Sequence, residues 1–434
     1  ENVQKIITTL QMYGYEAYAV GGCVRDSFLG REPMDWDITT SAMPEETKAL
    51  FPHTFDTGIE HGTITVLLDH EGFEVTTYRV DGKYEDSRHP KEVIFVRNLQ
   101  EDLLRRDFTI NAMAYNEKEG LVDIFGGMDD LKAGIIRCVG NAQARFSEDA
   151  LRILRGIRFA AQLGFELEDE TREGMRLLAP TLRKISAERI QVELVKTLTS
   201  SRPDLLREAW KLGITKEFLP EFDLAMETTQ ETVHHMYTVG EHILHTLLEV
   251  RPDRILRLTM LLHDIGKPYM KTMDADGVAH FKGHPEKSSE LANEILHRLK
   301  FDNDTIRKVT KLVRYHDHRM PVTPAHVRRA VHEIGEDLFP LYLEVRRADV
   351  AAQSMYQHKE KVADIDGVEK LYHEIMERKE CVSLKMLAVT GKDLIAAGMK
   401  PGKEIGQMLE HFLDLVLEHP ELNQKEELLK RIEL

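Results

Sequence analysis

Two aspartates separated by one residue, Asp35 and Asp37, are the feature that most restricts what this chain can fold into. They follow a Gly-Gly-Cys-Val-Arg-Asp stretch at residues 21–26 and a Leu-Gly-Arg-Glu-Pro stretch at residues 29–33. On a β-strand, residues i and i+2 point to the same face of the sheet. We therefore expect a strand over residues 34–39 that projects both carboxylates from one surface, where they can bind magnesium.

The glycine pair before the aspartates predicts a site for phosphate. Gly21 and Gly22 precede a helix that we expect to begin near Val24, so backbone N–H groups and the positive end of the helix dipole can receive a triphosphate. Two magnesium ions can stabilise the attacking and the leaving oxygen of an in-line displacement at phosphorus. An isolated Asp-x-Asp is also common in surface turns, which is the structural alternative.

The ordered string Gly-Gly-x-Val-Arg-Asp, Leu-Gly-Arg-x-Pro and Asp-x-Asp-Ile resembles the signature of nucleotidyltransferases of the DNA polymerase beta superfamily. It is most similar to the class II branch, which contains the CCA-adding tRNA nucleotidyltransferases and the bacterial poly(A) polymerases. The resemblance implies that Asp35 and Asp37 hold magnesium as catalytic residues. It also implies that Gly22 and Arg25 bind the nucleotide.

Two further strands are expected over residues 63–68 and 73–78, joined as a hairpin around His-Glu-Gly. The second resembles the family strand that carries a third carboxylate, which here is Glu74; an exposed strand glutamate is the alternative. Residues 81–93 are polar, contain Gly and Pro, and predict a loop. The resemblance implies that this loop is needed for adding the terminal adenosine.

A Leu-Arg-Arg-Asp-Phe-Thr-Ile-Asn-Ala stretch at residues 104–112 is similar to the second family motif. Arginines such as Arg106 can pair with triphosphate oxygens through their planar donor forks. Asp107 and Asn111 offer an acceptor and a donor to the sugar. A helix with a basic flank is the alternative. The Gly-Gly-x-Asp-Asp-Leu stretch that ends at residue 131 resembles the family hinge, and we expect the head to end there.

Residues 146–152, Phe-Ser-Glu-Asp-Ala-Leu-Arg, predict the start of a long helical region with Ser147 as N-cap. Asp149 and Arg152 are three residues apart and would share a helix face, where they complement the Watson–Crick edge of a base. The resembled enzymes use this pair to select CTP and ATP without a template. Arg155 and Arg158 continue the helical spacing and would face either the RNA backbone or solvent.

Residues 185–194 resemble the last family motif. Glu188, Arg189 and Glu193 have spacings that suit ion pairs along one helix. We interpret them as structural braces of the neck.

A second constellation follows from residue 234 onward, where histidines become frequent. An apolar stretch ends in a His-Asp doublet and resembles the HD phosphohydrolase superfamily. The resemblance implies a metal site at His242, His263, Asp264, His284 and Asp349. Imidazoles and a bridging carboxylate suit a transition metal such as Ni²⁺ or Mn²⁺. The site would be catalytic or a structural staple, and the position of His316 relative to it is not fixed by the sequence.

Composition narrows the class of protein. The chain has 434 residues and a formal net charge of −16, with most of the acidic excess in residues 1–140, so any RNA surface must be a local basic stripe. No apolar run is long enough to span a membrane and no signal pattern is present, which predicts a cytoplasmic protein. The three cysteines are far apart, as expected for reduced thiols.

The predicted fold class is α+β: a small mixed-sheet nucleotidyltransferase head followed by all-α neck, body, HD-type and tail helices. The expected segments are a head at 1–140, a neck at 141–200, a body connection at 201–230, an HD-type metal-binding domain at 231–355 and a tRNA-binding tail at 356–434. In the tail, Pro401 and Gly402 are expected to open a helix whose N-terminus can receive an RNA phosphate.

The resemblance implies a magnesium-dependent enzyme that adds the 3′-terminal CCA, or its terminal A, to tRNA from CTP and ATP and releases pyrophosphate. It implies no membrane and no obligate protein partner. An enzyme adding only the terminal adenosine and a poly(A) polymerase remain open within the same class. An HD phosphohydrolase with an inert head and a non-catalytic RNA-binding protein remain open from other classes.

Overall fold

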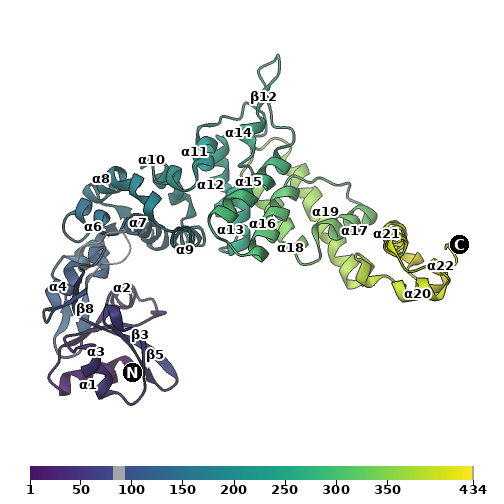
Figure 1. The fold of residues 1–434 in the computed structure, drawn as a ribbon. Coiled ribbons are helices and arrows are strands. Elements are labelled where there is room, and N and C mark those ends of the chain that lie inside the picture. The colour runs from purple at the N-terminus through teal and green to yellow at the C-terminus, as the bar shows by residue number, and fades with distance from the viewer. Residues whose placement is uncertain (82–92, 433–434) are drawn as a thin grey trace. The chain divides into compact units, whose positions relative to one another are not determined.

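The computed structural model describes residues 1–81 and 93–432. They form two compact units, Glu1–Pro220 and Glu221–Leu434, which run from purple to yellow in Figure 1. The first unit combines a sheet with helices, and the second is almost entirely helical. The fold class is therefore α+β, as predicted from the sequence.

A seven-stranded mixed sheet, in the order β3-β4-β5-β2-β1-β8-β9, is the centre of the first unit. Its strands are β1 (Ala17–Val20), β2 (Asp37–Thr40), β3 (Thr54–Gly58), β4 (Thr63–Leu68), β5 (Glu71–Thr77), β8 (Ala114–Asn116) and β9 (Gly120–Val122). Only β2 and β5 are parallel, and their register places Asp37 opposite Glu74. All four residues of β1 are buried, as expected for a central strand.

Helices of the first unit include α2, which follows the Gly-Gly turn, and α7, the longest. Their bounds are α1 (Asn2–Met12), α2 (Gly22–Phe28), α3 (Pro44–Leu50), α4 (Leu99–Leu104), α5 (Gly127–Ala133), α6 (Ala142–Glu148), α7 (Leu151–Leu163), α8 (Asp169–Leu178), α9 (Ala187–Leu198) and α10 (Leu206–Lys211), with 3₁₀ turns η1 (Ile59–His61), η2 (Thr109–Asn111), η3 (Ala179–Lys184), η4 (Pro203–Leu205) and η5 (Thr215–Glu217). Short strands β10 (Ile135–Ile136) and β11 (Glu166–Leu167) pair in parallel.

The strand expected over residues 34–39 begins only at Asp37, so Asp35 precedes it. The reason lies in the partner strand. Ala19 is opposite Ile38, and β1 ends one residue later at the Gly21 turn, so the residues before Asp37 have no partner on the β1 side of β2. The expected hairpin is present as β4 and β5. Most of the polar stretch at residues 81–93 lies outside the described residues.

The ends of that stretch were expected to be loop, but they form strands β6 (Arg79–Asp81) and β7 (Val93–Phe95), which pair antiparallel. The expected N-cap at Ser147 was also wrong. Ser147 lies inside α6, which ends at Glu148 and is followed by Asp149 with an extended backbone. The Asp149 carboxylate accepts a hydrogen bond from the Leu151 backbone N–H at 3.0 Å. Such local bonds compete with helix continuation and separate α6 from α7.

The second unit is a set of helices with one projecting hairpin, β12–β13 (Figure 1). Helix α11 (Pro220–Glu227) lies at the boundary. The other elements are α12 (Val239–Glu249), α13 (Arg254–Leu262), α14 (Lys267–Met270), β12 (Thr272–Met273), β13 (Ala279–His280), α15 (His284–Arg298), α16 (Asn303–Tyr315), α17 (Pro324–Ile334), α18 (Phe339–Ala351), α19 (His358–Glu377), η6 (Leu384–Met386), α20 (Gly391–Ala396), α21 (Lys403–Glu418), η7 (Pro420–Leu422) and α22 (Lys425–Leu429). Helix α21 begins directly after Gly402, as expected.

None of the helices within residues 1–81 and 93–432 combines the length and the apolar character that a membrane span requires.

Candidate nucleotide site and candidate metal cluster

Three carboxylates lie near one another where the neighbouring central strands β2 and β5 run side by side. The parallel register of β2 and β5 puts Glu74 beside Asp37, and Asp35 lies two residues before Asp37. Loss of water around its carboxylate and the nearby Asp35 raise the pKa of Asp37, although Arg106 opposes the shift. Burial and the charges of Asp37 and Asp35 likewise raise the pKa of Glu74. Crowded anionic oxygens of this kind fit a hard divalent cation such as Mg²⁺.

The Gly-Gly turn approaches an arginine closely. Gly21 has φ +83°, and a Cβ at this position would lie 3.1 Å from the Arg106 guanidinium. Arg25, on α2, donates to the Asn111 side-chain oxygen at 2.7 Å. The turn, the first helix and the second motif therefore form one continuous surface beside the aspartates.

Asp107 lies at the centre of a buried polar network behind this surface. It accepts a hydrogen bond from Asn111 at 3.2 Å and forms an ion pair with Arg155 at 2.7 Å. Burial alone would raise the pKa of Asp107, but Arg155 outweighs that effect and lowers the pKa to about 2. Asn111 therefore has contacts within the protein on both ends of its amide, to Arg25 and to Asp107.

Eleven of the twelve residues that the sequence predicted for this site line a cavity of about 860 Å³. Those that line it are Gly22, Arg25, Asp35, Asp37, Arg106, Asp107, Asn111, Asp149, Arg152, Arg155 and Arg158. The twelfth, Glu74, lies on the adjacent strand opposite Asp37. Residues separated by more than one hundred positions in the chain thus surround a single space large enough for a small ligand.

Asp149 and Arg152 line the same cavity but do not bond to each other. Asp149 forms an ion pair with Arg189 at 2.8 Å, and Arg152 forms one with Glu148 at 2.6 Å. Arg152 also donates to the Arg105 carbonyl at 3.0 Å. The expectation of a shared helix face was wrong in its local geometry because Asp149 precedes α7. The two side chains nevertheless present an acceptor and a donor fork to one space.

Arg155 and Arg158 both line the cavity. Arg158 pairs with Glu193 at 2.7 Å, and its guanidinium lies 4.3 Å from the centre of the Phe159 ring. Phe159 also lies within 5.1 Å of the Arg25 guanidinium, an arrangement that favours cations over an aromatic face. Burial lowers the pKa of Arg158.

The last motif was expected to brace the neck along one helix. Instead, Arg189 and Glu193 pair across to Asp149 and Arg158, and Arg189 lines the cavity. Sequence reasoning also missed Asp102, a fully buried carboxylate on α4. A signal was available, because Asp102 precedes two arginines at helical spacings of three and four residues.

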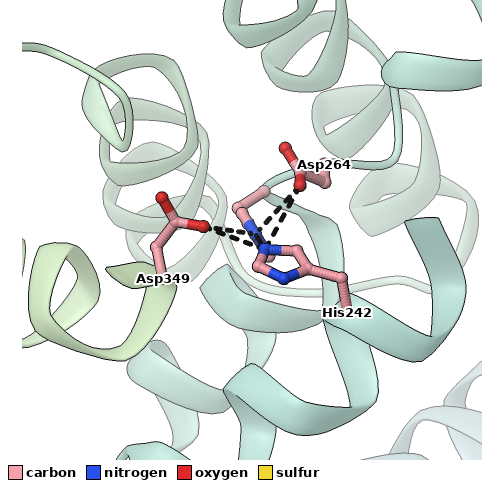
Figure 2. A group of neighbouring side chains, drawn as sticks. His242, Asp264 and Asp349 are labelled. Atoms are coloured by element: carbon pink, nitrogen blue, oxygen red, sulfur yellow. Dashed lines mark hydrogen bonds and ion pairs between the residues drawn. The ribbon is translucent and has the colours of Figure 1, made fainter. Parts of the chain in front are cut away.

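The second unit brings the predicted histidines and aspartates together. Figure 2 shows His242 on α12 facing Asp349 on α18 and Asp264 after α13. The His242 Nε2 atom lies 2.9 Å from Asp349 Oδ1 and 3.5 Å from Asp264 Oδ2. His263 Nε2 lies 3.4 Å from Asp264 Oδ2. The ligand atoms of all four residues lie within 4.8 Å of one another, as a metal site requires.

His316, which the sequence could not place, joins the cluster from the other side of Asp264. The Oδ1 atom of Asp264 lies 3.3 Å from His284 Nε2 and 3.4 Å from His316 Nε2. These three residues form a second group of close ligand atoms. Asp264 belongs to both groups and could bridge two ions.

The orientations of the histidine rings suit metal binding. In all four histidines the Nδ1 atom lies against a backbone carbonyl, which leaves Nε2 as an acceptor: the partners are Ala352 for His242, Met260 for His263, Phe281 for His284 and Val313 for His316. This is the orientation that metal-binding histidines usually have. Neither Asp264 oxygen has a hydrogen-bond partner among the described residues, although Lys267 lies 2.8 Å away as an ion pair. Several acceptors therefore face one another and fit a cation.

Charge in the cluster is unbalanced. Burial by itself would lower the pKa of His263, but Asp264 and Asp349 outweigh it and raise the pKa to about 10. Burial lowers the pKa of His316, and the neighbouring His263 and His284 oppose the attraction of Asp264. Lys267 offsets the charge of one of the two buried carboxylates, and a proton or a metal ion can supply the other positive charge.

Three family models match separate parts of the chain: the poly A polymerase head domain at residues 17–137, a probable RNA- and SrmB-binding site of polymerase A at 164–226, and tRNA nucleotidyltransferase domain 2 at 283–432. The crystal structure of the Bacillus stearothermophilus CCA-adding enzyme with CTP has a TM-score of 0.72 at 28% identity. That alignment covers 99% of this chain and 96% of the other. A Thermotoga maritima CCA-adding enzyme bound to tRNA shares the fold, with a TM-score of 0.61 at 22% identity over 100% and 95% of the two chains.

Similar sequences extend over almost the whole chain. The CCA-adding enzyme of Levilactobacillus brevis is 36% identical over 94% of this chain and 91% of its own length. That of Limosilactobacillus reuteri is 34% identical over 100% and 96%. The identity and the coverage together show that this chain belongs to the family of CCA-adding enzymes, the tRNA nucleotidyltransferases.

Proposed function

We propose that the first unit adds the 3′-terminal CCA, or its terminal adenosine, to tRNA with CTP and ATP as substrates. The reaction forms a bond between the tRNA 3′-oxygen and the α-phosphorus. It breaks the bond from the α-phosphorus to the bridging oxygen and releases pyrophosphate and a proton. The observation that carries this proposal is the cavity, where metal-binding carboxylates, arginines and an Asp/Arg pair line one space.

The side chains have separate tasks in this proposal. Asp35, Asp37 and Glu74 would hold magnesium, which when bound neutralises the triphosphate and makes the 3′-hydroxyl more acidic. Arg106 and the turn at Gly22 bind the phosphates. Asp149 and Arg152 read the base edge by hydrogen bonds. Most of the rate acceleration then comes from position and charge, as in other phosphoryl transfers.

Incubation with tRNA that ends before the CCA tests the proposal. CTP alone, ATP alone and both together are supplied with labelled nucleotide and Mg²⁺. Incorporation of CMP excludes both an A-adding enzyme and a poly(A) polymerase, and termination after one AMP supports full CCA addition. The double variant Asp35→Ala plus Asp37→Ala should abolish incorporation. An unchanged rate in that variant would contradict the assignment of the catalytic carboxylates.

A second activity is supported by the cluster of the second unit. We propose that His242, His263, Asp264, His284 and Asp349, with His316, bind a transition metal such as Ni²⁺ or Mn²⁺ and hydrolyse a phosphate ester. The supporting observation is the shared position of Asp264 between two groups of ligand atoms. Lys267, Lys282 and Arg319 line the adjoining cavity of about 320 Å³ and suit an anionic substrate.

Bis-p-nitrophenyl phosphate with Ni²⁺ or Mn²⁺ tests this second activity. Release of nitrophenol that is lost in Asp264→Asn supports it. Metal binding without turnover would reduce the cluster to a structural staple. Nucleotide incorporation should not change in that variant, because the two sets of residues lie in different units.

We further propose that the chain consists of a head at 1–140, a neck at 141–200, a connection at 201–230, an HD-type segment at 231–355 and a tRNA-binding tail at 356–434. We also propose that the protein works in the cytoplasm; its three cysteines, all unpaired and buried, are compatible with a reducing compartment.

A further inference from the structure

A buried carboxylate that the proposed mechanism does not use lies beside the nucleotide cavity. Asp102 is 0% exposed. Its Oδ1 atom accepts hydrogen bonds from the Arg105 guanidinium at 3.0 Å and from the Arg79 backbone N–H at 3.3 Å. Its Oδ2 atom accepts one from the Thr39 hydroxyl at 3.1 Å and lies 3.5 Å from the Arg106 guanidinium. The carboxylate thus has four polar partners on three segments of the chain: β2, β6 and the residues that follow α4.

These partners belong to the parts of the chain that form the catalytic edge. Thr39 lies on β2 two residues after Asp37, and therefore on the same face of that strand. Arg79 begins β6 after β5, the strand of Glu74. Asp102 therefore bonds directly to the strand of Asp37 and to β6, which follows the strand of Glu74 after one intervening residue.

The other two partners line the cavity. Arg105 and Arg106 both lie on its wall, and Arg106 also approaches the Gly21 turn. Both arginine side chains are long and flexible, and each loses conformational freedom when its guanidinium group is bound. A buried anion that binds both guanidinium groups reduces that freedom before the ligand arrives. Burial would raise the pKa of Asp102, but the charges of Arg105 and Arg106 outweigh it and lower the pKa. Asp102 therefore keeps its negative charge, which offsets the repulsion between the two guanidinium groups.

We propose that Asp102 is a positioning residue for the triphosphate: it directs Arg105 and Arg106 into the cavity and fixes them relative to the strands of Asp37 and Glu74. The inference rests on the proposed nucleotidyl transfer in the first unit. Asp102 touches no substrate and does not read the base. It therefore sets the affinity for the triphosphate of CTP and ATP equally.

The variant Asp102→Asn tests this role, because it keeps the shape and removes the charge. We expect the KM for CTP and for ATP to rise by about tenfold, the effect of weakening one charge-assisted contact. The kcat at saturating nucleotide should stay within about threefold, and the ratio between the two nucleotides should not change. Equilibrium dialysis of labelled CTP without tRNA should show the same loss of affinity in the absence of turnover.

Asp130→Asn is a matched control in the same unit. Asp130 is 7% exposed and accepts from the Thr109 hydroxyl at 2.6 Å and from Arg137 at 3.1 Å. Neither Asp130 nor Arg137 lines the cavity. The control should lower the unfolding temperature without raising KM. An equal rise in KM in both variants, or no rise in Asp102→Asn, would overturn the proposal.

Thr39→Val provides the test if the Asp102→Asn variant does not fold. It removes only the hydroxyl that bonds to Asp102 and suits a strand. A rise in KM of about twofold to threefold for both nucleotides is expected, and an unchanged KM would overturn the proposal. Failure of the proposed function can be distinguished from failure of this inference. The proposed function requires the wild-type chain to extend tRNA, whereas the dialysis comparison measures only nucleotide binding.

Discussion

Asp149 has two contacts that fix its side chain before any nucleotide binds. One oxygen accepts the Leu151 N–H, and the other pairs with Arg189. The first contact ends α6 and turns the chain, and the second comes from a helix forty residues later. In its proposed role of reading the base edge, a carboxylate held in this way would need little rearrangement when the base arrives, which favours selectivity.

Asp149→Asn should weaken nucleotide selection. The amide replaces an acceptor by a donor at one position, so the hydrogen bonds expected with the base edge no longer match. We expect incorporation of UMP and GMP relative to CMP and AMP to rise by about tenfold or more. Competition assays with labelled nucleotides measure this ratio. Asp169→Asn, a change at an exposed residue of α8, is the control and should leave the ratio unchanged.

Asp107→Asn should destabilise the first unit in a pH-dependent way. The folded pKa of Asp107 is about 2 because Arg155 outweighs burial, whereas an unfolded aspartate has a pKa of about 3.9. Stability from this group is therefore present above about pH 4 and is lost as the pH falls toward 2. At pH 6 we expect the variant to unfold at a lower urea concentration, because its free energy of unfolding falls by about 3 kcal/mol. The difference from wild type should shrink between pH 4 and the acid limit, and a constant difference would contradict the assignment.

At the scale of elements, the contact between α5 and η2 depends on a missing side chain. A Cβ on Gly127 would lie 2.3 Å from the Thr109 carbonyl oxygen. The neighbouring Gly126 has φ +75°, a conformation that glycine adopts without strain. The glycine pair, which the sequence predicts to be a hinge, thus also allows close packing against the segment that contains Asn111.

Gly127→Ala should lower the free energy of unfolding by about 1–3 kcal/mol, because the new methyl group meets backbone that cannot move away. Gly156→Ala is the matched comparison. Its methyl group would meet mainly the flexible end of Met175, which can shift. Urea unfolding of both variants should show the larger loss for Gly127→Ala, and equal losses would contradict this account.

Elements with local signals could be predicted from the sequence, and those set by distant partners could not. Helix α3 starts at Pro44 and ends at Leu50 as expected, since proline suits the first turn. The start of β2 depended on where β1 ends, which no local pattern reveals. The same is true of the site: the motif residues reached one cavity, but the pairing of Arg189 with Asp149 and the place of His316 arise only from tertiary packing.

At the scale of the whole molecule, each compact unit has its own group of candidate metal ligands, with different chemistry. The first group consists of carboxylates, which suit magnesium. The second is rich in imidazole, which suits transition metals. One chain could therefore bind two kinds of ion without competition between them.

His242→Ala should remove transition-metal binding from the second unit and leave tRNA extension within about twofold of wild type. Metal retained after gel filtration measures the first effect, and labelled nucleotide incorporation measures the second. His245→Ala is the matched control, since His245 lies on the same helix but stacks on Tyr237 outside the cluster. Normal metal content in His242→Ala would contradict the predicted ligand set.

The tight turn at Asp69 and His70, both with positive φ, joins β4 to β5 and thereby sets the register of β5 against β2. Side chains alternate along a strand, so deleting one residue there would exchange Glu74 for a buried neighbour such as Phe73 or Val75. The third acidic group would then face the hydrophobic interior. In the proposed site, the length of this two-residue turn would therefore fix the position of the third carboxylate, although neither Asp69 nor His70 lines the cavity.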